Sequence, residues 1–189
     1  MRKLVVFTRV SLNGAYARGD ETVVNWSIPD PSVDRKAHEL MSPDTVVFGR
    51  LTYQVFENVW PAVAADPNMP AGMRKMGEEL NEMTKVVFSR TLTDVEWVNT
   101  ELYHGDVEAT VGKLKEGTGG DIVIFGSGEI VRQLANADLV DEYLLAVTPV
   151  VLDDPKLMFE GVKEQKMKLI GTHSFDSGNV LLHYAARQA

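Results

Sequence analysis

Three short segments of the chain end an apolar run with residues that bind phosphate groups well. They read F-G-R-L-T-Y at 48–53, F-S-R-T-L at 88–92 and F-G-S-G-E at 125–129. Glycine lets a backbone approach a ligand closely, and the free N–H groups at the start of a following helix attract anions. Charge and neutral hydrogen-bond donors are available from Arg50, Thr52, Ser89, Arg90 and Ser127. Together the three turns indicate a nucleotide site, although each one alone is more often a simple tight turn.

The third segment departs from the dinucleotide fingerprint of Rossmann folds. That fingerprint, G-x-G-x-x-G, places a small residue where this chain has Val131. It also expects an acid about 20 residues further on, and Asp141 and Glu142 come too early for that role. We therefore interpret the segment as one of several cooperating phosphate-facing turns.

Composition excludes several other chemistries. The chain has no cysteine, which removes thiol nucleophiles, disulfides and thiolate zinc sites and fits a cytoplasmic protein. The formal net charge of -8 disfavours nucleic acids and anionic membranes as partners, and no apolar stretch approaches the ~20 residues of a membrane span. The four histidines lack metal-ligand spacing, so we expect no metal site. Neither a P-loop nor a G-x-S-x-G nucleophile elbow is present.

Apolar periodicity predicts strands and helices that alternate along the chain. Strands are expected at 3–10, 44–48, 85–89, around Trp97, and at 122–125 and 141–151; helices are expected at 32–41, from 49 onwards, at 71–83, 107–114 and 128–136. Three prolines within 58–70 predict a long loop there. The segments 167–175 and 179–186 flank D-S-G-N and predict a closing hairpin.

This order predicts a single α/β domain over residues 1–189, with a mixed, mostly parallel sheet flanked by helices and a C-terminal antiparallel hairpin. Ligands bind at the carboxyl ends of strands in such sheets. The three turns are therefore expected to meet at one edge.

Several motifs, taken in order, resemble a known family. They are S-L-N-G-A-Y-A at 11–17, G-R-L-T-Y at 49–53, S-R at 89–90, G-S-G-E-I-V at 126–131 and A-D-L-V-D-E-Y-L-L-A-V-T-P-V-V-L at 137–152. The chain resembles the dihydrofolate-reductase-like superfamily, in the group related to the C-terminal reductase domain of the bifunctional riboflavin-biosynthesis deaminase-reductase. The resemblance implies NADPH as cofactor, hydride transfer to a C=N or C=O bond of a small heterocycle, and a homodimer.

The resemblance also implies roles for individual residues. Gly49, Arg50 and Thr52 would contact the adenosine 2′-phosphate and the pyrophosphate, and Ser89 and Arg90 would flank the adenosine phosphate. The pyrophosphate would be wrapped by Gly126, Ser127, Gly128, Glu129 and Ile130. The nicotinamide would lie beside Asn13, Gly14 and Ala17.

The substrate side departs from both parent activities. Dihydrofolate reductases carry an acid soon after a W-x-x-P motif. Here W-S-I-P at 26–29 precedes Asp30 and Asp34. We favour Asp34 as the proton donor, with a tyrosine or water as alternatives. Riboflavin reductases carry an arginine in H-x-L-R, and here H-E-L-M at 38–41 ends in Met41. The expected pocket walls are Trp26, Met41, Tyr53 and Phe56.

Two functions therefore stay open. The first is an NADPH-dependent reductase, for which reduction of a 5-amino-6-ribosylaminouracil phosphate is the nearest named activity and that of dihydrofolate a weaker match. The second is a catalytically inactive NADPH-binding module that acts as a sensor or scaffold.

Overall fold

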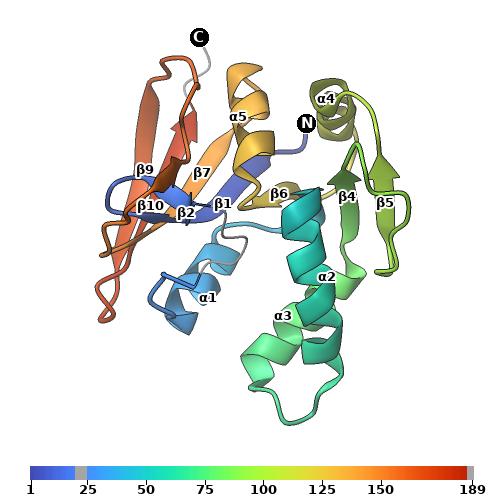
Figure 1. The fold of residues 1–189 in the computed structure, drawn as a ribbon, viewed down its shortest axis with the longest axis horizontal. Helices are drawn as coiled ribbons and strands as arrows, with labels where there is room; N and C mark the ends of the chain where they lie inside the picture. Colours follow the sequence, from blue (N-terminus) through green and yellow to red (C-terminus); the bar gives the residue numbers. More distant parts are fainter. Residues whose placement is uncertain (20–24, 187–189) are drawn as a thin grey trace.

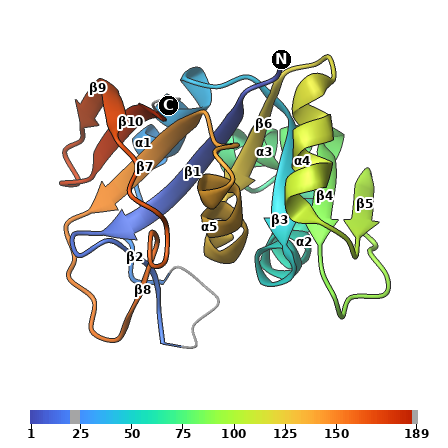
Figure 2. The same cartoon turned by 90° about the horizontal axis from the view of Figure 1, so that it is seen from above.

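A computed structural model describes residues 1–19 and 25–186, and its main feature is an eight-stranded sheet in the order β5-β4-β3-β6-β1-β7-β10-β9. The neighbouring strands from β5 to β7 run parallel, while β10 is antiparallel to both β7 and β9. These strands are β1 (Leu4–Ser11), β3 (Pro43–Gly49), β4 (Thr84–Phe88), β5 (Thr100–Tyr103), β6 (Asp121–Phe125), β7 (Glu142–Thr148), β9 (Met167–Ser174) and β10 (Val180–Ala186). The mixed, mostly parallel sheet with a C-terminal hairpin is the predicted architecture (Figure 2).

Helices cover both faces of the sheet (Figure 1). One face carries α4 (Val107–Glu116) and α5 (Gly128–Asn136), and the other carries α1 (Pro31–Glu39), α2 (Arg50–Ala65) and α3 (Ala71–Glu82). The central strands are buried on both sides, because apolar residues of β1 alternate between the two cores: Leu4 and Val6 join one, and Val5 and Phe7 the other.

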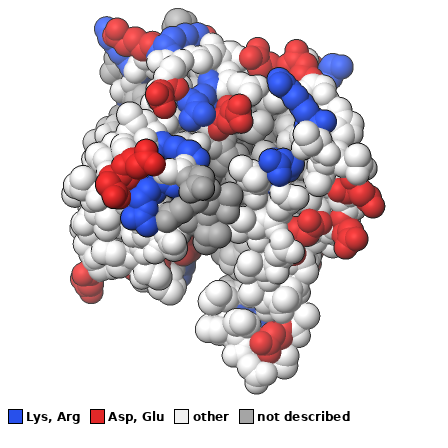
Figure 3. Space-filling model, viewed as in Figure 1, with Lys and Arg blue, Asp and Glu red and all other residues white. Residues whose placement is uncertain are grey.

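The predicted loop over 58–70 is wrong in its first half. Helix α2 continues through Pro61 to Ala65, and only the short connection after it is irregular. Pro61 lacks the N–H of a helical hydrogen bond, but this part of α2 packs closely on α3, where Gly77 lies directly against Ala64. Helix packing therefore outweighs the proline signal, and α2 and α3 form a lobe that projects from the sheet beside a surface hollow (Figures 1 and 3).

Two further details differ from the sequence expectation. The strand expected around Trp97 lies at β5 instead, and Trp97 is buried in the preceding turn, where its indole N–H donates to Asn81 Oδ1 at 2.7 Å. A small second sheet pairs β2 (Ala15–Arg18) with β8 (Pro155–Leu157), and the sequence did not indicate it. This second sheet lies beside the carboxyl end of β1, so it borders the predicted site (Figure 2).

Candidate functional site

A large cavity of about 910 Å³ lies at the carboxyl ends of the parallel strands. Its walls come from residues that end or follow β1, β3, β4, β5 and β6, together with α1, the α2–α3 lobe, α5 and the β2–β8 sheet. The volume is near the upper end of the range usual for small-molecule sites. The three turns that the sequence singled out thus meet in one cavity, as a parallel sheet requires.

Two helices begin at this cavity without a side-chain cap. Gly49 precedes α2 and Ser127 precedes α5, and neither residue makes a capping hydrogen bond to its own helix. By contrast, Asp30 caps α1 and Asp106 caps α4. The first N–H groups of α2 and α5 are therefore available to an anionic ligand in the cavity.

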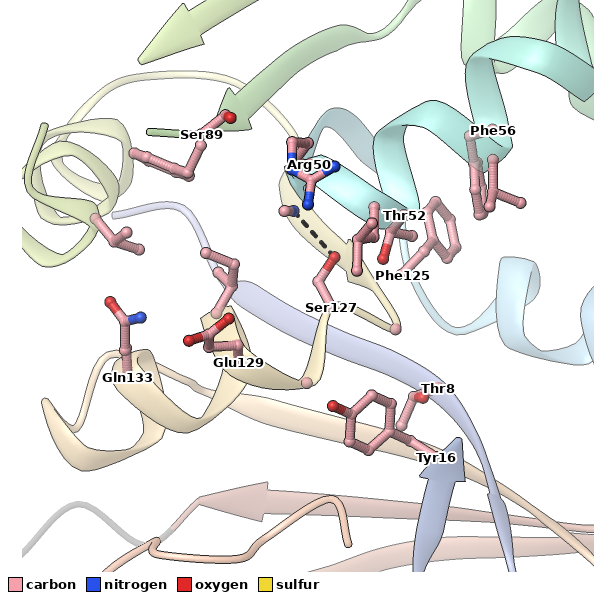
Figure 4. A pocket seen from close by; sticks show the side chains of 18 of the residues that line it. Thr8, Tyr16, Arg50, Thr52, Phe56, Ser89, Phe125, Ser127, Glu129 and Gln133 are labelled. Atoms are coloured by element: carbon pink, nitrogen blue, oxygen red, sulfur yellow. Dashed lines mark hydrogen bonds between the residues drawn. The ribbon is translucent and has the colours of Figure 1, made fainter. Parts of the chain in front are cut away.

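The turn between β6 and α5 has a strained backbone that is held by a hydrogen bond. Gly126 has a φ of 59° and Ser127 a φ of 48°, and this left-handed region is costly for serine. The Ser127 hydroxyl accepts a hydrogen bond from Gly49 N–H at 3.1 Å, which ties two of the three turns together (Figure 4). The strain is thus localised where the chain must bend around the cavity.

Tyr16, from β2, packs on the start of α5 (Figure 4). A Cβ atom at Gly128 would lie 2.5 Å from the Tyr16 Cζ and 2.7 Å from its Cε1, so only glycine leaves room for this ring. Arg132 of α5 also contacts this tyrosine, with its guanidinium 5.9 Å from the centroid of the Tyr16 ring. The tyrosine therefore forms part of the cavity wall beside the first turn of α5.

The turn after β4 is shaped by Ser89. Its hydroxyl accepts hydrogen bonds from Thr91 N–H at 3.1 Å and Leu92 N–H at 2.8 Å, and its carbonyl lies 2.8 Å from His104 Nδ1. Arg90 follows as an exposed side chain at the cavity mouth. Ser89 thus fixes the backbone that presents Arg90.

Three basic side chains at the cavity form no ion pair with the described acids, whereas Arg9 is paired with Asp34. Among residues 1–19 and 25–186, Arg50, Arg90 and Lys156 form no ion pair, and Arg50 instead donates to Gln54 Oε1 at 3.2 Å. The chain as a whole carries a net charge of -8. Unpaired cations at this one cavity are therefore a local feature that favours an anionic ligand.

The opposite end of the cavity is apolar and aromatic. Phe7 and Phe125 meet edge to face with ring centroids 6.0 Å apart, and Phe56 stacks on Phe125 at 5.6 Å. Trp60 and Met76 of the lobe complete this wall. We call these five residues the aromatic end of the cavity.

One ion pair lines the cavity from the same face of the sheet. Arg9 Nη2 donates to Asp34 Oδ1 at 2.8 Å and to Oδ2 at 2.9 Å. Burial raises the pKa of Asp34, and the neighbouring guanidinium of Arg9 opposes that rise. The pair is held by α1, whose Val33 and Ala37 pack on the same core as Phe7.

Most of the predicted cofactor residues line this cavity. They are Ala17, Gly49, Arg50, Thr52, Ser89, Arg90, Gly126, Ser127, Gly128, Glu129 and Ile130. Asn13 and Gly14 lie outside its lining: the Asn13 amide bonds the backbone of Leu152 at 2.9 Å and 3.1 Å, and the Gly14 carbonyl accepts from Met158 N–H. Their observed contacts join the end of β1 to the segment before and after β8.

The predicted substrate walls are only partly brought together. Phe56 and Asp34 line the cavity, but Tyr53 and Met41 do not. Tyr53 is fully buried and donates to Glu57 Oε1 at 2.6 Å, and Met41 is buried in the core beside a separate small hollow. Trp26 also lies outside the lining, and its indole N–H is buried with no acceptor among the described residues. Helical spacing explains why Tyr53 lies outside the cavity lining: it points to the sheet side of α2, whereas Thr52 and Phe56 face the cavity.

Sequence reasoning missed several cavity residues. Phe7, Thr8 and Arg9 lie in β1, where Phe7 pairs with Phe125 at the end of β6, so the parallel topology could have indicated them. Trp60 fell in the segment predicted as loop, and Tyr16 and Lys156 belong to the second sheet. For these three, long-range contacts that are not encoded in local patterns decide the position.

Comparison with known proteins agrees with this geometry. The sequence pattern that defines the family described as "RibD C-terminal domain" matches residues 2–181. The chain belongs to this family. A Bacillus subtilis (strain 168) relative, "Uncharacterized protein YyaP", is 30% identical over 185 residues, which cover 97% of this chain and 94% of the relative. The RibD C-terminal family is of the reductase type, so the chain is related to oxidoreductases.

Solved structures share the fold of this RibD-type chain. A candidate riboflavin biosynthesis protein from Shewanella sp. PV-4 superimposes with a TM-score of 0.70 at 19% identity, covering 98% of this chain and 99% of the other. Acinetobacter baumannii RibD superimposes with a TM-score of 0.70 at 15% identity, covering all of this chain and 59% of the other. At these identities the likeness establishes the RibD-like fold.

No helix of the described residues has the length and apolar character that crossing a membrane requires.

Proposed function

We propose that the chain is an NADPH-dependent reductase that transfers hydride to a C=N or C=O bond of a small heterocyclic substrate. The observation that carries the proposal is the meeting of three strand-end turns, two uncapped helix starts and unpaired arginines at one cavity. Membership of a reductase-type family supports the same reaction class.

The residues present fit a dinucleotide. The start of α5, with Gly126, Ser127 and Gly128, would hold the pyrophosphate through backbone N–H groups. Arg50 and Arg90 would hold the adenosine 2′-phosphate, because a guanidinium matches the geometry of a phosphate group. Glu129 lies in the first turn of α5, where its charge suits the helix dipole.

The substrate would occupy the aromatic end of the cavity. When bound, NADPH supplies a hydride to carbon, and a proton completes the reduction at nitrogen or oxygen. Asp34 is the acid predicted for this role; burial raises its pKa, while its ion pair with Arg9 favours the carboxylate form. We therefore propose that Asp34 orients the substrate or a proton-delivering water. A homodimer remains a prediction from the family resemblance.

A binding module without catalysis is the second proposal. It shares the cofactor turns with the reductase and differs in having no turnover. A spectrophotometric assay at 340 nm, with pterins, ribosylaminopyrimidines and quinones as acceptors, separates the two. Oxidation of NADPH that depends on an acceptor supports the enzyme, and bound NADPH that no acceptor oxidises supports the module.

Arginine substitutions test the cofactor assignment. Replacing Arg50 or Arg90 by alanine should weaken NADPH by roughly tenfold or more, because each loses a charge-assisted contact worth ~1.5–3 kcal/mol. NADH, which lacks the 2′-phosphate, should lose much less. Isothermal titration calorimetry of both cofactors measures this difference.

Arg74→Ala serves as a matched control, since Arg74 pairs with Glu78 on α3 and does not line the cavity. It should leave both affinities unchanged. Equal losses for NADPH and NADH in the cavity variants would remove the phosphate role from these arginines, and no NADPH binding by the unaltered chain would refute the proposed function.

A further inference from the structure

The unpaired cations of the cavity lie in a defined order along the edge of the sheet. Strands β4, β3, β6 and β1 are consecutive neighbours, so the segments that follow them lie in the same order. Arg90 follows β4, Arg50 follows β3 and the start of α5 follows β6. The β2–β8 sheet lies beside the carboxyl end of β1 and brings Lys156 to the cavity (Figure 2). The start of α5 therefore lies between two arginines on one side and a lysine on the other.

Lys156 shares a face of the β2–β8 sheet with a second cavity residue. It pairs with Ala17 across the two antiparallel strands, and side chains directly opposite each other point to the same face. Both residues line the cavity. The register advances from Ala15 to Ala17 on β2 while it moves by one residue on β8, so Tyr16 is the extra residue of a β-bulge. The bulge lets Tyr16 pack on Gly128 without disturbing the pair beside it.

The backbone around Lys156 is tied to the rest of the fold. Met158 is fully buried, and its N–H donates to the Gly14 carbonyl at 2.9 Å. On the other side of Lys156, the Asp154 carbonyl accepts from Gly19 N–H at 2.9 Å. The lysine side chain itself is exposed. The fold therefore sets where this cation begins, and its long side chain reaches outward to a ligand in the cavity.

The described acids do not neutralise Lys156. Among residues 1–19 and 25–186 this lysine forms no ion pair. Asp153 of the same segment pairs with Arg18 instead, at 3.5 Å. Glu129 lines the cavity from the first turn of α5 and is not paired with the lysine. In a chain with a net charge of -8, a cation left uncompensated at a cavity favours an anionic ligand there.

The pyrophosphate of the proposed dinucleotide is such an anion. It carries two negative charges, whereas the start of a helix offers only about half a positive charge. Arg50 and Arg90 are assigned to the adenosine 2′-phosphate in the proposed function. The pyrophosphate at α5 therefore needs a further cation, and Lys156 lies on the side of α5 that the arginines leave open.

We propose that Lys156 binds the dinucleotide at the phosphate that carries the nicotinamide ribose. The order of the cations gives the direction of the ligand. With the 2′-phosphate at Arg50 and Arg90, the adenosine half lies at the ends of β4 and β3, and the nicotinamide half extends past α5 toward β1. Lys156 meets this second half. The inference rests on the proposed function and adds to it a binding residue from the β2–β8 sheet.

Calorimetric titrations with NADP⁺, NAD⁺ and adenosine 2′,5′-bisphosphate test the assignment. The bisphosphate keeps both phosphates of the adenosine half of NADP⁺ and lacks the phosphate of the nicotinamide half. Lys156→Gln should weaken NADP⁺ by about five- to tenfold, because it removes a charge-assisted contact that solvent partly screens. NAD⁺ keeps the pyrophosphate and should lose the same factor. The bisphosphate should bind both proteins equally well.

Matched variants separate the charge of Lys156 from any structural role. Lys156→Arg keeps the cation and should restore most of the NADP⁺ affinity. Lys163→Gln removes a lysine that pairs with Asp138 and does not line the cavity, and it should change no affinity. The loss caused by Lys156→Gln should shrink at about 0.5 M salt, because salt screens exposed charges. The Tm of Lys156→Gln without ligand should equal that of the unaltered chain.

The outcomes distinguish this inference from the proposed function. An equal loss of NADP⁺ and of the bisphosphate in Lys156→Gln would overturn the inference, because the lysine would then act on the adenosine half. NADP⁺ binding that Lys156→Gln leaves unchanged would overturn the inference and keep the proposed function. Failure of the unaltered chain to bind either dinucleotide would refute both.

Discussion

The contact between Gly128 and Tyr16 allows a quantitative test of how the second sheet shapes the cavity wall at the start of α5. In a Gly128→Ala variant the new Cβ would lie 2.5–2.9 Å from three ring atoms of Tyr16, whereas ordinary contacts lie at 3.4–4 Å. The ring must therefore retreat by about 1 Å, because repulsion rises steeply inside the contact distance. Tyr16 packs on the core that α5 shares with the sheet, so the movement disturbs the wall of the cavity.

The magnitude follows from two opposing effects. Overpacking of this kind costs about 1–3 kcal/mol, and replacing glycine by alanine in a helix returns about 0.5–1 kcal/mol. The net expectation is a loss of roughly 0.5–2 kcal/mol of unfolding free energy. For a chain of 189 residues, at about 2–4 °C per kcal/mol, this lowers Tm by about 1–8 °C. Urea unfolding followed by circular dichroism, with a thermal scan, measures both quantities.

Gly112→Ala is the matched control, since a Cβ at this position of α4 meets no atom within 4 Å. It should be stabilising by about 0.5–1 kcal/mol. In a Tyr16→Ala background, Gly128→Ala should lose its cost and behave like the control. The reasoning is refuted if Gly128→Ala costs the same with and without the Tyr16 ring, or if it stabilises the unaltered chain.

Two further predictions concern the Ser127 turn and the buried Lys85. Ser127→Ala and Ser127→Gly both remove the hydrogen bond that Gly49 N–H donates, but only glycine relieves the strain of the positive φ. Urea unfolding should therefore find the glycine variant more stable than the alanine variant by about 1 kcal/mol. The reverse order would contradict backbone strain at this position. Lys85 is fully buried and donates to the carbonyls of Leu80, Asn81 and Met83, and burial lowers its pKa to about 8. Between pH 8 and about 10, Lys85 keeps its proton in the unfolded chain but has lost it in the folded chain, so the free energy of unfolding should rise with pH. Lys85→Met should remove this rise in unfolding curves measured over the same pH range. An equal dependence on pH in both proteins would contradict the lowered pKa of Lys85.

Local pattern determined much of the fold. Apolar runs such as 122–125 can only be buried strands between turns, and their alternation with helices dictates a parallel sheet whose carboxyl ends meet. That topology is why Gly49, Ser89 and Ser127, far apart in the chain, line one cavity. The placement of these turns followed from the sequence because strand direction fixes it without any knowledge of side-chain packing.

Tertiary packing decided what local pattern could not. The prolines near the end of α2 indicate a loop in isolation, and only contact with α3 keeps Pro61 and Trp60 helical and brings Trp60 to the cavity. Tyr53 and Met41 have the composition of pocket walls, but the orientation of their elements turns both into the core. Arg9 and Asp34 are 25 residues apart and become one neutral pair because α1 packs beside β1. The sequence by itself therefore determined the sheet and the strand-end turns that meet at its edge. The tertiary structure decided which side chains face the cavity, because that choice depends on contacts between distant segments.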